Sequence, residues 1–171
     1  MATGEIVVIQ ISSGALFYPT ETGLINILTG EVPNNHIEID ALFSYVKHLR
    51  ERSLIDYFIP MTINRYHNRY ANKANPIYKK IYDIDWMKPE IKVNTLGGKV
   101  KRLLALYTTL SWTNNLIFDL VGVDPEGGQA IYKLVKTIAT EGGAAILIDY
   151  NDEFKNDCTT FVKAEYLDSL Q

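Results

Sequence analysis

The sequence predicts an α/β or α+β protein: a single domain over residues 1–171, with a mixed β-sheet, a C-terminal βαβ unit and helices packed on the sheet. Three observations support this prediction. The length of 171 residues, with 47% apolar and 22% charged residues, is typical of one globular domain. β-Branched residues and turn signals dominate the first 30 residues. Residues 116–150 show strand, helix and strand signals in that order.

The N-terminal part of the chain predicts short strands and then a helix. Turn signals at Ser12-Ser-Gly14 and Thr20-Glu-Thr-Gly23 divide strands near 5–11, 15–18 and 24–28, which we expect to pair in antiparallel fashion. From Asp40, a probable N-cap by its residue type, apolar residues recur with a helical period through Leu49.

The middle of the chain predicts helices and connections. The apolar stretch Leu54–Ile63 contains Pro60, so a strand there would lie at a sheet edge or end at the proline. Thr62 is a candidate cap for a helix that carries Tyr66 and Tyr70, and Pro76 ends that helix or opens a short one through Tyr82. Residues 83–98 read as connection, with a short strand near 91–93, and residues 99–111 as a third helix.

The clearest unit is the predicted βαβ unit at residues 116–150. A strand at 116–123 precedes Asp124 and Pro125, an N-cap followed by proline at the first helical position. A helix at 130–140 then stops at a Gly-Gly pair. The apolar run at 144–150 reads as a buried parallel strand, and a last strand is expected near 160–166.

Several motif classes are absent from the sequence. It contains no Gly-x-Ser-x-Gly elbow, no phosphate loop that ends Gly-Lys-Ser/Thr and no Gly-x-Gly-x-x-Gly. The three histidines lie in different predicted elements and suggest no metal site. Cys158 follows Asp157, whose negative charge disfavours a thiolate nucleophile. We therefore predict no catalytic residues, no metal and no cofactor.

The cysteine content and the hydropathy of the chain indicate its cellular compartment. One cysteine cannot form an intramolecular disulfide, and a reducing compartment is the simplest interpretation. No apolar run approaches the roughly 18–20 residues that span a bilayer. We expect a cytoplasmic protein that does not engage a membrane.

Charge is distributed unevenly along the chain. Residues 1–56 hold three Lys or Arg against seven Asp or Glu, residues 57–118 hold ten against three, and residues 119–171 hold four against ten. The basic part contains a basic tyrosine-rich segment, residues 64–80, with five cations and no acid. Arg65, Arg69 and Lys73 recur every four residues, so one helix would present them as a single stripe. The predicted partner-binding residues are Arg65, Tyr66, Arg69, Tyr70, Lys73, Lys79 and Lys80.

The main functional hypothesis is a non-enzymatic structural or interaction protein that uses this segment. Cations interleaved with aromatic residues can bind nucleic acid, another protein or a second copy of the chain. The net charge of −3 makes a dominant nucleic-acid role less favourable. Contact between the basic middle and the acidic C-terminal third of another copy would give a self-assembling homo-oligomer.

The alternative hypothesis is an α/β enzyme or ligand-binding domain that uses Asp124 and Asp149. In open α/β sheets, ligands gather at the carboxyl ends of the strands, where both residues are expected. The stretches Val121-Gly-Val-Asp-Pro125 and Gly142-Gly-Ala-Ala-Ile-Leu-Ile-Asp149 resemble parts of SAM-dependent methyltransferases. The resemblance implies that an acidic residue after a strand would bind the ribose of the cofactor. It covers about a tenth of the chain, and 109–115 lacks the glycine-rich loop of that family.

Overall fold

The computed structural model describes residues 1, 3–37, 41–49 and 60–165. Contacts between Cα atoms divide the chain into two compact units. The first comprises residues 1–45, 114–119 and 135–171, and the second comprises residues 46–113 and 120–134. The single-domain organisation therefore stays a prediction, and each unit is described by itself.

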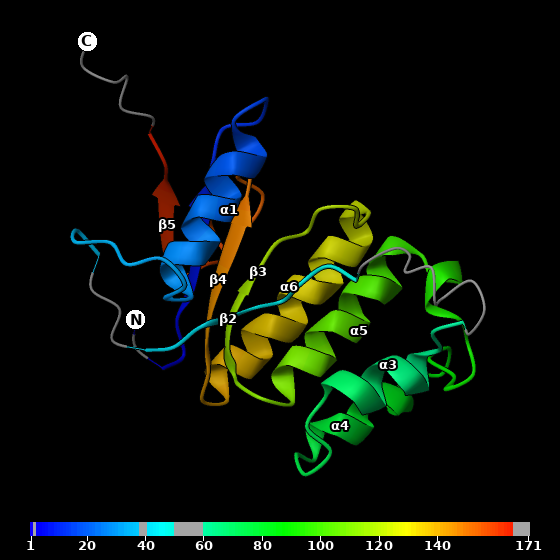
Figure 1. Ribbon diagram of the computed structural model, residues 1–171. Helices are drawn as coiled ribbons and strands as arrows, with labels where there is room; N and C mark the ends of the chain where they lie inside the picture. The colour runs from blue at the N-terminus through cyan, green and yellow to red at the C-terminus, as the bar shows by residue number, and fades with distance from the viewer. Residues whose placement is uncertain (2, 38–40, 50–59, 166–171) are drawn as a thin grey trace. The chain divides into compact units, whose positions relative to one another are not determined.

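The first unit contains a five-stranded sheet in the order β2-β3-β4-β1-β5 (Figure 1). The strands are β1 (Ile6–Gln10), β2 (Ser44–Tyr45), β3 (Asn115–Phe118), β4 (Ala144–Asp149) and β5 (Thr160–Lys163). All four strand pairs are parallel. The α/β class is confirmed, whereas the expected mixed sheet with antiparallel pairing is wrong.

The parallel pairing explains why the N-terminal region is not a set of short hairpins. β1 pairs with β4, with Ile6 opposite Ala145, and not with the segment that follows it in sequence. Parallel strands need a long crossover, and helix α1 (Phe17–Leu28) supplies it. The strands predicted at 15–18 and 24–28 are therefore wrong, and Pro19 is tolerated because it lies in the first turn of α1.

The region 41–49 also differs from the sequence-based prediction. Ser44 and Tyr45 pair with Leu116 and Ile117 as a two-residue strand, where the sequence predicts a helix. Leu42 is 81% exposed, although the helical pattern assigned it to the buried face. Strand pairing at Ser44 and Tyr45 overrides the local period, because it satisfies backbone groups beside β3. Asp40 and most of the stretch 54–63 lie outside the described residues.

The βαβ unit is confirmed. β3 is followed by α6 (Pro125–Thr140) and by β4, which pairs with β3 in parallel. The Asp124 carboxylate accepts a hydrogen bond from the Gly127 N–H at 2.9 Å, as expected of an N-cap. All six residues of β4 are buried, since the strand lies between β3 and β1. β3 ends at Phe118, earlier than predicted.

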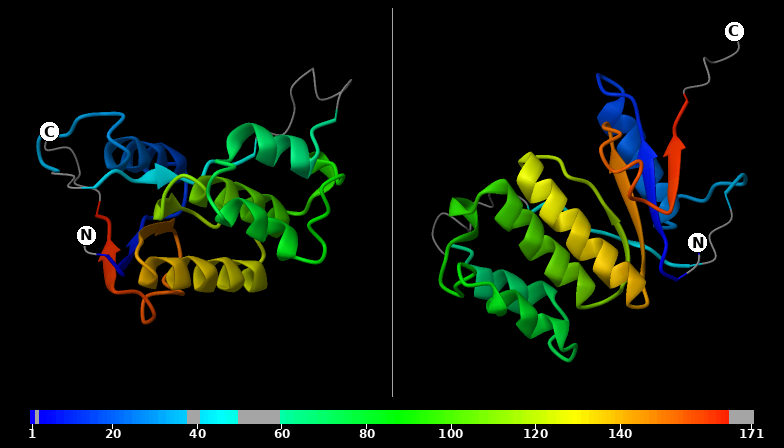
Figure 2. Two further views of the ribbon diagram at one scale, coloured as in Figure 1. Left: turned by 90° about the horizontal axis from the view of Figure 1, so that it is seen from below. Right: turned by 180° about the vertical axis from the view of Figure 1, so that it is seen from behind.

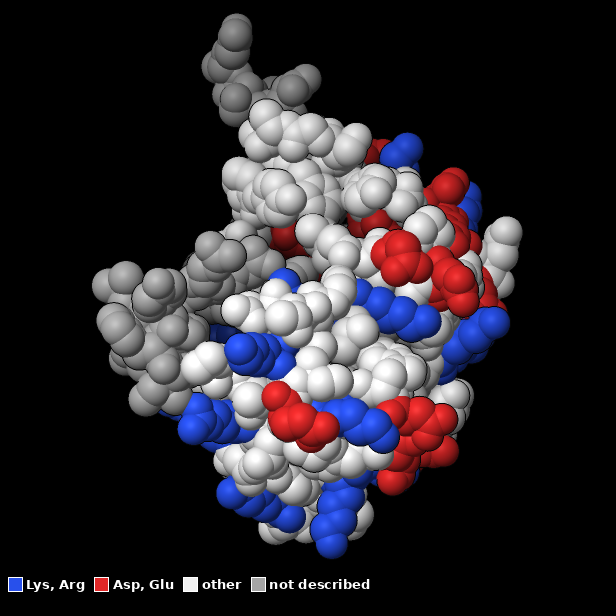
Figure 3. Space-filling view, turned by 90° about the vertical axis from the view of Figure 1, so that its right-hand side faces the viewer, with Lys and Arg blue, Asp and Glu red and all other residues white. Residues whose placement is uncertain are grey.

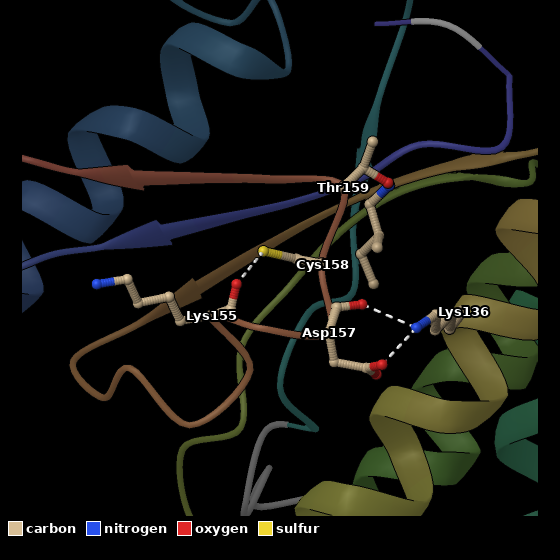
Figure 4. Close-up of polar contacts among 6 residues, drawn as sticks. Lys136, Lys155, Asp157, Cys158 and Thr159 are labelled. Atoms are coloured by element: carbon tan, nitrogen blue, oxygen red, sulfur yellow. Dashed lines mark hydrogen bonds and ion pairs between the residues drawn. The ribbon is translucent and has the colours of Figure 1, made fainter.

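Helices cover both faces of the sheet. The connection from β1 to β2 and the connection from β3 to β4 run in opposite directions across the sheet. Right-handed crossovers therefore place α1 and the part of α6 in this unit on opposite faces, as Figure 2 shows. After β4, residues 150–159 lead to β5, and the Lys136 ammonium on α6 holds this connection through the Asp157 carboxylate at 2.6 Å (Figure 4).

The second unit is helical. Its elements are α3 (Ile63–Tyr70), α4 (Ile77–Lys80), the 3₁₀ turns η1 (Ile81–Asp83) and η2 (Val93–Thr95), α5 (Gly98–Leu110) and the first part of α6. The predicted helices after Thr62, after Pro76 and at 99–111 are confirmed. A single antiparallel bridge between Thr62 and Lys92 takes the place of the strand expected near 91–93 among the described residues.

Candidate functional site

The basic tyrosine-rich segment does not form one helical stripe. α3 ends at Tyr70, and the backbone of Ala71 is extended, so Lys73 lies beyond the helix that carries Arg65 and Arg69. Lys79 and Lys80 belong to α4. The Asn-rich turn between the helices is held to α5 by hydrogen bonds, among them one from the Asn72 N–H to the Ser111 hydroxyl at 2.8 Å. These bonds favour a turn over continuation of the helix.

The predicted partner-binding residues differ in exposure. Arg65, Arg69, Tyr70, Lys73, Lys79 and Lys80 are exposed, and Tyr66 is half-buried. The ring of Tyr66 lies 4.9 Å from the ring of Tyr70, and burial, with a smaller contribution from Tyr70, raises the pKa of Tyr66 to about 12. Figure 3 shows Lys and Arg side chains on one face of the molecule, interspersed with Asp, Glu and neutral residues.

His67 lies inside the second unit and supports the fold. Its ring is fully buried, with Nε2 2.9 Å from the Tyr78 carbonyl and Nδ1 3.0 Å from the Thr108 hydroxyl. A carbonyl only accepts, so Nε2 carries a proton and donates it. Burial lowers the pKa of His67, against the opposing effect of the Tyr78 carbonyl. These contacts join α3, α4 and α5.

Asp124 and Asp149 have different surroundings. Asp124 is exposed, belongs to the second unit and caps α6. Asp149 is buried at the end of β4 in the first unit, where its carboxylate accepts hydrogen bonds from the Tyr150 and Asn151 N–H groups. The structure therefore supports a capping role for the first residue and a place at the sheet edge for the second.

A second carboxylate lies at the same edge of the sheet. Asp119 follows β3 directly, is 1% exposed and accepts a hydrogen bond from the Tyr45 hydroxyl at 2.6 Å. Burial raises the pKa of Asp149, and the charges of Glu153 and Asp119 raise it further, against two backbone hydrogen bonds that lower it. We call Asp119 and Asp149 the sheet-edge carboxylates.

Sequence reasoning missed Asp119 because the predicted strand continued to residue 123. A short apolar run that ends in aspartate, Leu116-Ile-Phe-Asp119, was the signal that could have identified it. Among the described residues, no group of three or more His, Cys, Asp and Glu is arranged to hold a metal ion.

Described residues of the second unit line two surface depressions. One, of about 480 Å³, is lined in part by Thr62, Arg65 and Lys92. The other, of about 360 Å³, is lined in part by Lys101 and Arg102. Asp124 and Asp149 line neither of them.

The fold resembles those of solved ATP-binding proteins. An ATP binding subunit of an ABC transporter superposes with a TM-score of 0.66 at 15% identity, over 95% of this chain and 75% of that chain. The ADP conformation of an ATP-binding cassette of an ABC transporter gives a TM-score of 0.61 at 14% identity, over 91% and 74%. The fold is that of an ATP-binding cassette. RNase-L Inhibitor also shares it, with a TM-score of 0.58 at 16% identity, over 86% of this chain and 29% of that chain.

Sequence comparison gives a related result. No protein-family model matches the chain. The zinc import ATP-binding protein ZnuC of Buchnera aphidicola subsp. Acyrthosiphon pisum (strain APS) is 28% identical over 141 residues, covering 75% of this chain. The chain spans 57% of the length of that protein.

These comparisons correct the functional hypotheses drawn from the sequence. The expectation of a structural, self-assembling protein is wrong, because the similar proteins are ATP-binding proteins and two of them are parts of transporters. The methyltransferase alternative gains no support from them. One of the similar proteins is a subunit of a transporter. A subunit agrees with the expected protein partner, whereas a transporter conflicts with the expectation that the protein does not engage a membrane. No helix among the described residues is long and apolar enough to cross a membrane.

The cassette fold implies a nucleotide, so the fit of ATP can be tested on these residues. Phosphate-loop proteins place a Gly-rich loop that ends Gly-Lys-Ser/Thr between a strand and a helix, and they hold Mg²⁺ with an aspartate at a strand end. β1, residues 11–16 and α1 have the order strand, loop, helix, and Asp119 has the place of that aspartate. The loop residues themselves, Ile-Ser-Ser-Gly-Ala-Leu, do not fit a triphosphate, because they include one glycine and no lysine.

Proposed function

We propose that this chain is a cassette-type subunit of a transport assembly, in which it works beside a membrane-spanning subunit. The observation that carries the proposal is the 28% identity to a zinc import ATP-binding protein over 75% of the chain, on a cassette fold. The proposal concerns the role of a subunit, since the chain spans 57% of that relative.

The exposed end of α3 is the surface that we propose for contact with the partner subunit. Tyr70 is 46% exposed and Trp112 is 66% exposed, and the Trp112 indole N–H donates to the Tyr70 carbonyl at 2.8 Å. The Arg69 guanidinium lies 5.5 Å from the centre of the Tyr70 ring. Exposed aromatic residues beside arginine are typical of the residues that dominate binding energy at protein interfaces.

Site-specific photocrosslinking tests this proposal. The full chain, with p-benzoylphenylalanine in place of Tyr70, is produced in its native cells and irradiated in intact membranes. We expect the crosslinked product to contain a polypeptide with several membrane spans, identified by mass spectrometry. The same photoreactive residue in place of Tyr18, which is 63% exposed in the first unit, is the matched control.

Two results would contradict the proposal. One is a chain that crosslinks to no membrane-spanning protein from position 70. The other is equal crosslinking from positions 70 and 18, which would show contact without a defined surface.

A further inference from the structure

The corner formed by β1, residues 11–16 and α1 lacks the features that hold phosphate in a cassette fold. We infer that this chain does not bind a nucleoside triphosphate at this corner, and that in the proposed assembly the nucleotide is held by another chain. The second part of the inference rests on the proposed function, and the first part does not. Four independent observations at the corner support it.

The corner carries no cation of its own. The first 46 residues contain no Lys or Arg, so neither the loop nor α1 can supply the lysine that reaches the β- and γ-phosphates of a bound triphosphate. The charged residue that α1 does carry near its start is Glu21, whose side chain is 6% exposed. This carboxylate, in the second turn of the helix, adds no attraction for a phosphate.

Two of the first three helical positions of α1, Phe17 and Pro19, offer no free backbone N–H to an anion. An anion at a helix N-terminus is bound by N–H groups that lack partners inside the helix. Here the Phe17 N–H donates to the Gly14 carbonyl at 3.1 Å. Pro19 has no N–H at all.

Aromatic side chains pack at the same place. Phe17 is 7% exposed, and its ring lies 5.3 Å from the Tyr18 ring and 6.0 Å from the Tyr150 ring, both edge to face. The Gln10 side-chain amide at the end of β1 donates to the Tyr150 carbonyl at 3.2 Å. The loop after β4 thus contacts the start of α1 through a pair of aromatic rings and the end of β1 through a side-chain hydrogen bond.

One of the two sheet-edge carboxylates, Asp149, lies beside the corner. The Ile11 N–H donates to the backbone carbonyl of Asp149 at 2.9 Å, so the loop after β1 begins beside that residue. Lys163 on β5 pairs with Gln10 at the end of β1, and its side chain is exposed. Lys163 is therefore the residue that a test of the inference must include.

Calorimetric titration of the full chain with MgATP tests the first part of the inference. We expect no saturable binding, which corresponds to a Kd above about 1 mM. The zinc import ATP-binding protein, titrated in the same buffer, shows that the assay detects a cassette that binds ATP. A triple variant, Ser12→Ala with Ser13→Ala and Lys163→Ala, removes the hydroxyl groups of the loop and the ammonium group in register with the end of β1.

Each result of the titration decides the inference. Saturable binding that the triple variant weakens at least tenfold, with an unchanged circular dichroism spectrum, would overturn it. Binding that survives in the triple variant lies elsewhere on this chain, which supports the first part of the inference and overturns the second. The absence of binding supports the first part and agrees with the second. Crosslinking from position 70 reports on the proposed function separately, so a chain that crosslinks and binds ATP at the corner would overturn the inference alone.

Discussion

Asp149 is a charged residue in a place that disfavours charge. Its carboxylate is buried at the end of the central strand β4, and two backbone N–H groups only partly replace the water it loses. The neighbouring charges of Glu153 and Asp119 act in the same direction as burial. The folded protein therefore holds a proton on Asp149 more tightly than the unfolded chain does.

The substitution Asp149→Asn should stabilise the protein at pH 7. The amide oxygen can still accept the two backbone hydrogen bonds, and the buried charge is lost. Because the pKa is raised above its ordinary value of 3.8, the wild type loses stability as pH rises from 3.8 through the raised pKa. The difference in unfolding free energy should therefore vanish at and below about pH 3.8, as urea denaturation over a pH series would show.

Asp124→Asn is the matched control for that measurement. Asp124 is exposed and caps α6, and asparagine caps a helix about as well as aspartate. We expect its effect at pH 7 to stay within about 0.5 kcal/mol. An Asp149→Asn variant less stable than the wild type at pH 7 would show that the charge is compensated by contacts other than those described.

Single residues show what local pattern can predict. The capping roles of Thr62 and Asp124 were predictable, because a cap is decided by residues within one turn of helix. Asp119 was not singled out, because the point at which β3 ends depends on pairing with strands that are distant in sequence. The end of helix α3 between Arg69 and Lys73 was not predicted either, because it depends on hydrogen bonds from the following turn to α5.

The start of α5 makes a close backbone approach that requires glycine. A Cβ atom added to Gly98 would lie 1.8 Å from the Gly122 carbonyl oxygen, a backbone atom that cannot rotate away. Gly98→Ala should therefore lower the unfolding free energy by about 1–3 kcal/mol or more. Thermal and urea denaturation would measure this loss.

Gly97→Ala is the control at the adjacent position. A Cβ atom there meets nothing within 4 Å, and Gly97 has an ordinary φ of −70°. A change of about 1 kcal/mol or less is expected, as for other replacements at an N-cap. Equal losses for the two variants would indicate that α5 does not approach Gly122 as described.

The central strand β4 should dominate the stability of the first unit. Ile146 is 4% exposed and Leu147 is fully buried, so replacing either with alanine should cost about 2–5 kcal/mol. Val162 on the edge strand β5 is 44% exposed, and Val162→Ala should cost less than about 1 kcal/mol. A loss below 1 kcal/mol for Leu147→Ala, measured by urea denaturation, would place that side chain outside the core.

Elements were predictable where local signals and tertiary contacts agree. The βαβ unit has a cap, a helical period and a Gly-Gly stop that match its packing, and α5 has a matching helical period. α1 and β2 were mispredicted, because parallel pairing of β1 with β4 demands a crossover helix and pairing of β2 with β3 demands a strand. Both pairings join segments that are far apart in the sequence, so a pattern within about ten residues cannot predict them.

Charge follows the division of the molecule into two units. The first unit contains three Lys or Arg and thirteen Asp or Glu, whereas the second contains fourteen and seven. Their formal charges are therefore −10 and +7, and the whole chain has −3. The sequence showed this only as three alternating segments, because it could not show that the first and last segments fold together.

The protein should bind to a cation exchanger at pH 7 despite its pI of about 5.6. The second unit carries the positive charge. Near physiological ionic strength, screening over about 8–10 Å weakens the effect of the negative charge of the first unit on the binding of the second unit to the column. Elution should need added salt, and a variant with Arg69→Glu, Lys73→Glu and Lys79→Glu should elute earlier. Passage of the wild type through a column loaded at about 0.1 M ionic strength would contradict this prediction.

The register of β1 has a consequence for synthesis on the ribosome. Ile6 pairs with Ala145 and Val7 with Thr160, so this apolar strand is made first and finds its neighbours last. At about 5–20 residues per second, β1 waits roughly 7–30 s for β4 to emerge. Throughout that interval it is an unpaired apolar segment that a protease can reach. Protease cleavage within residues 6–10 of stalled nascent chains shorter than 140 residues, and protection of the full chain, would show this delay.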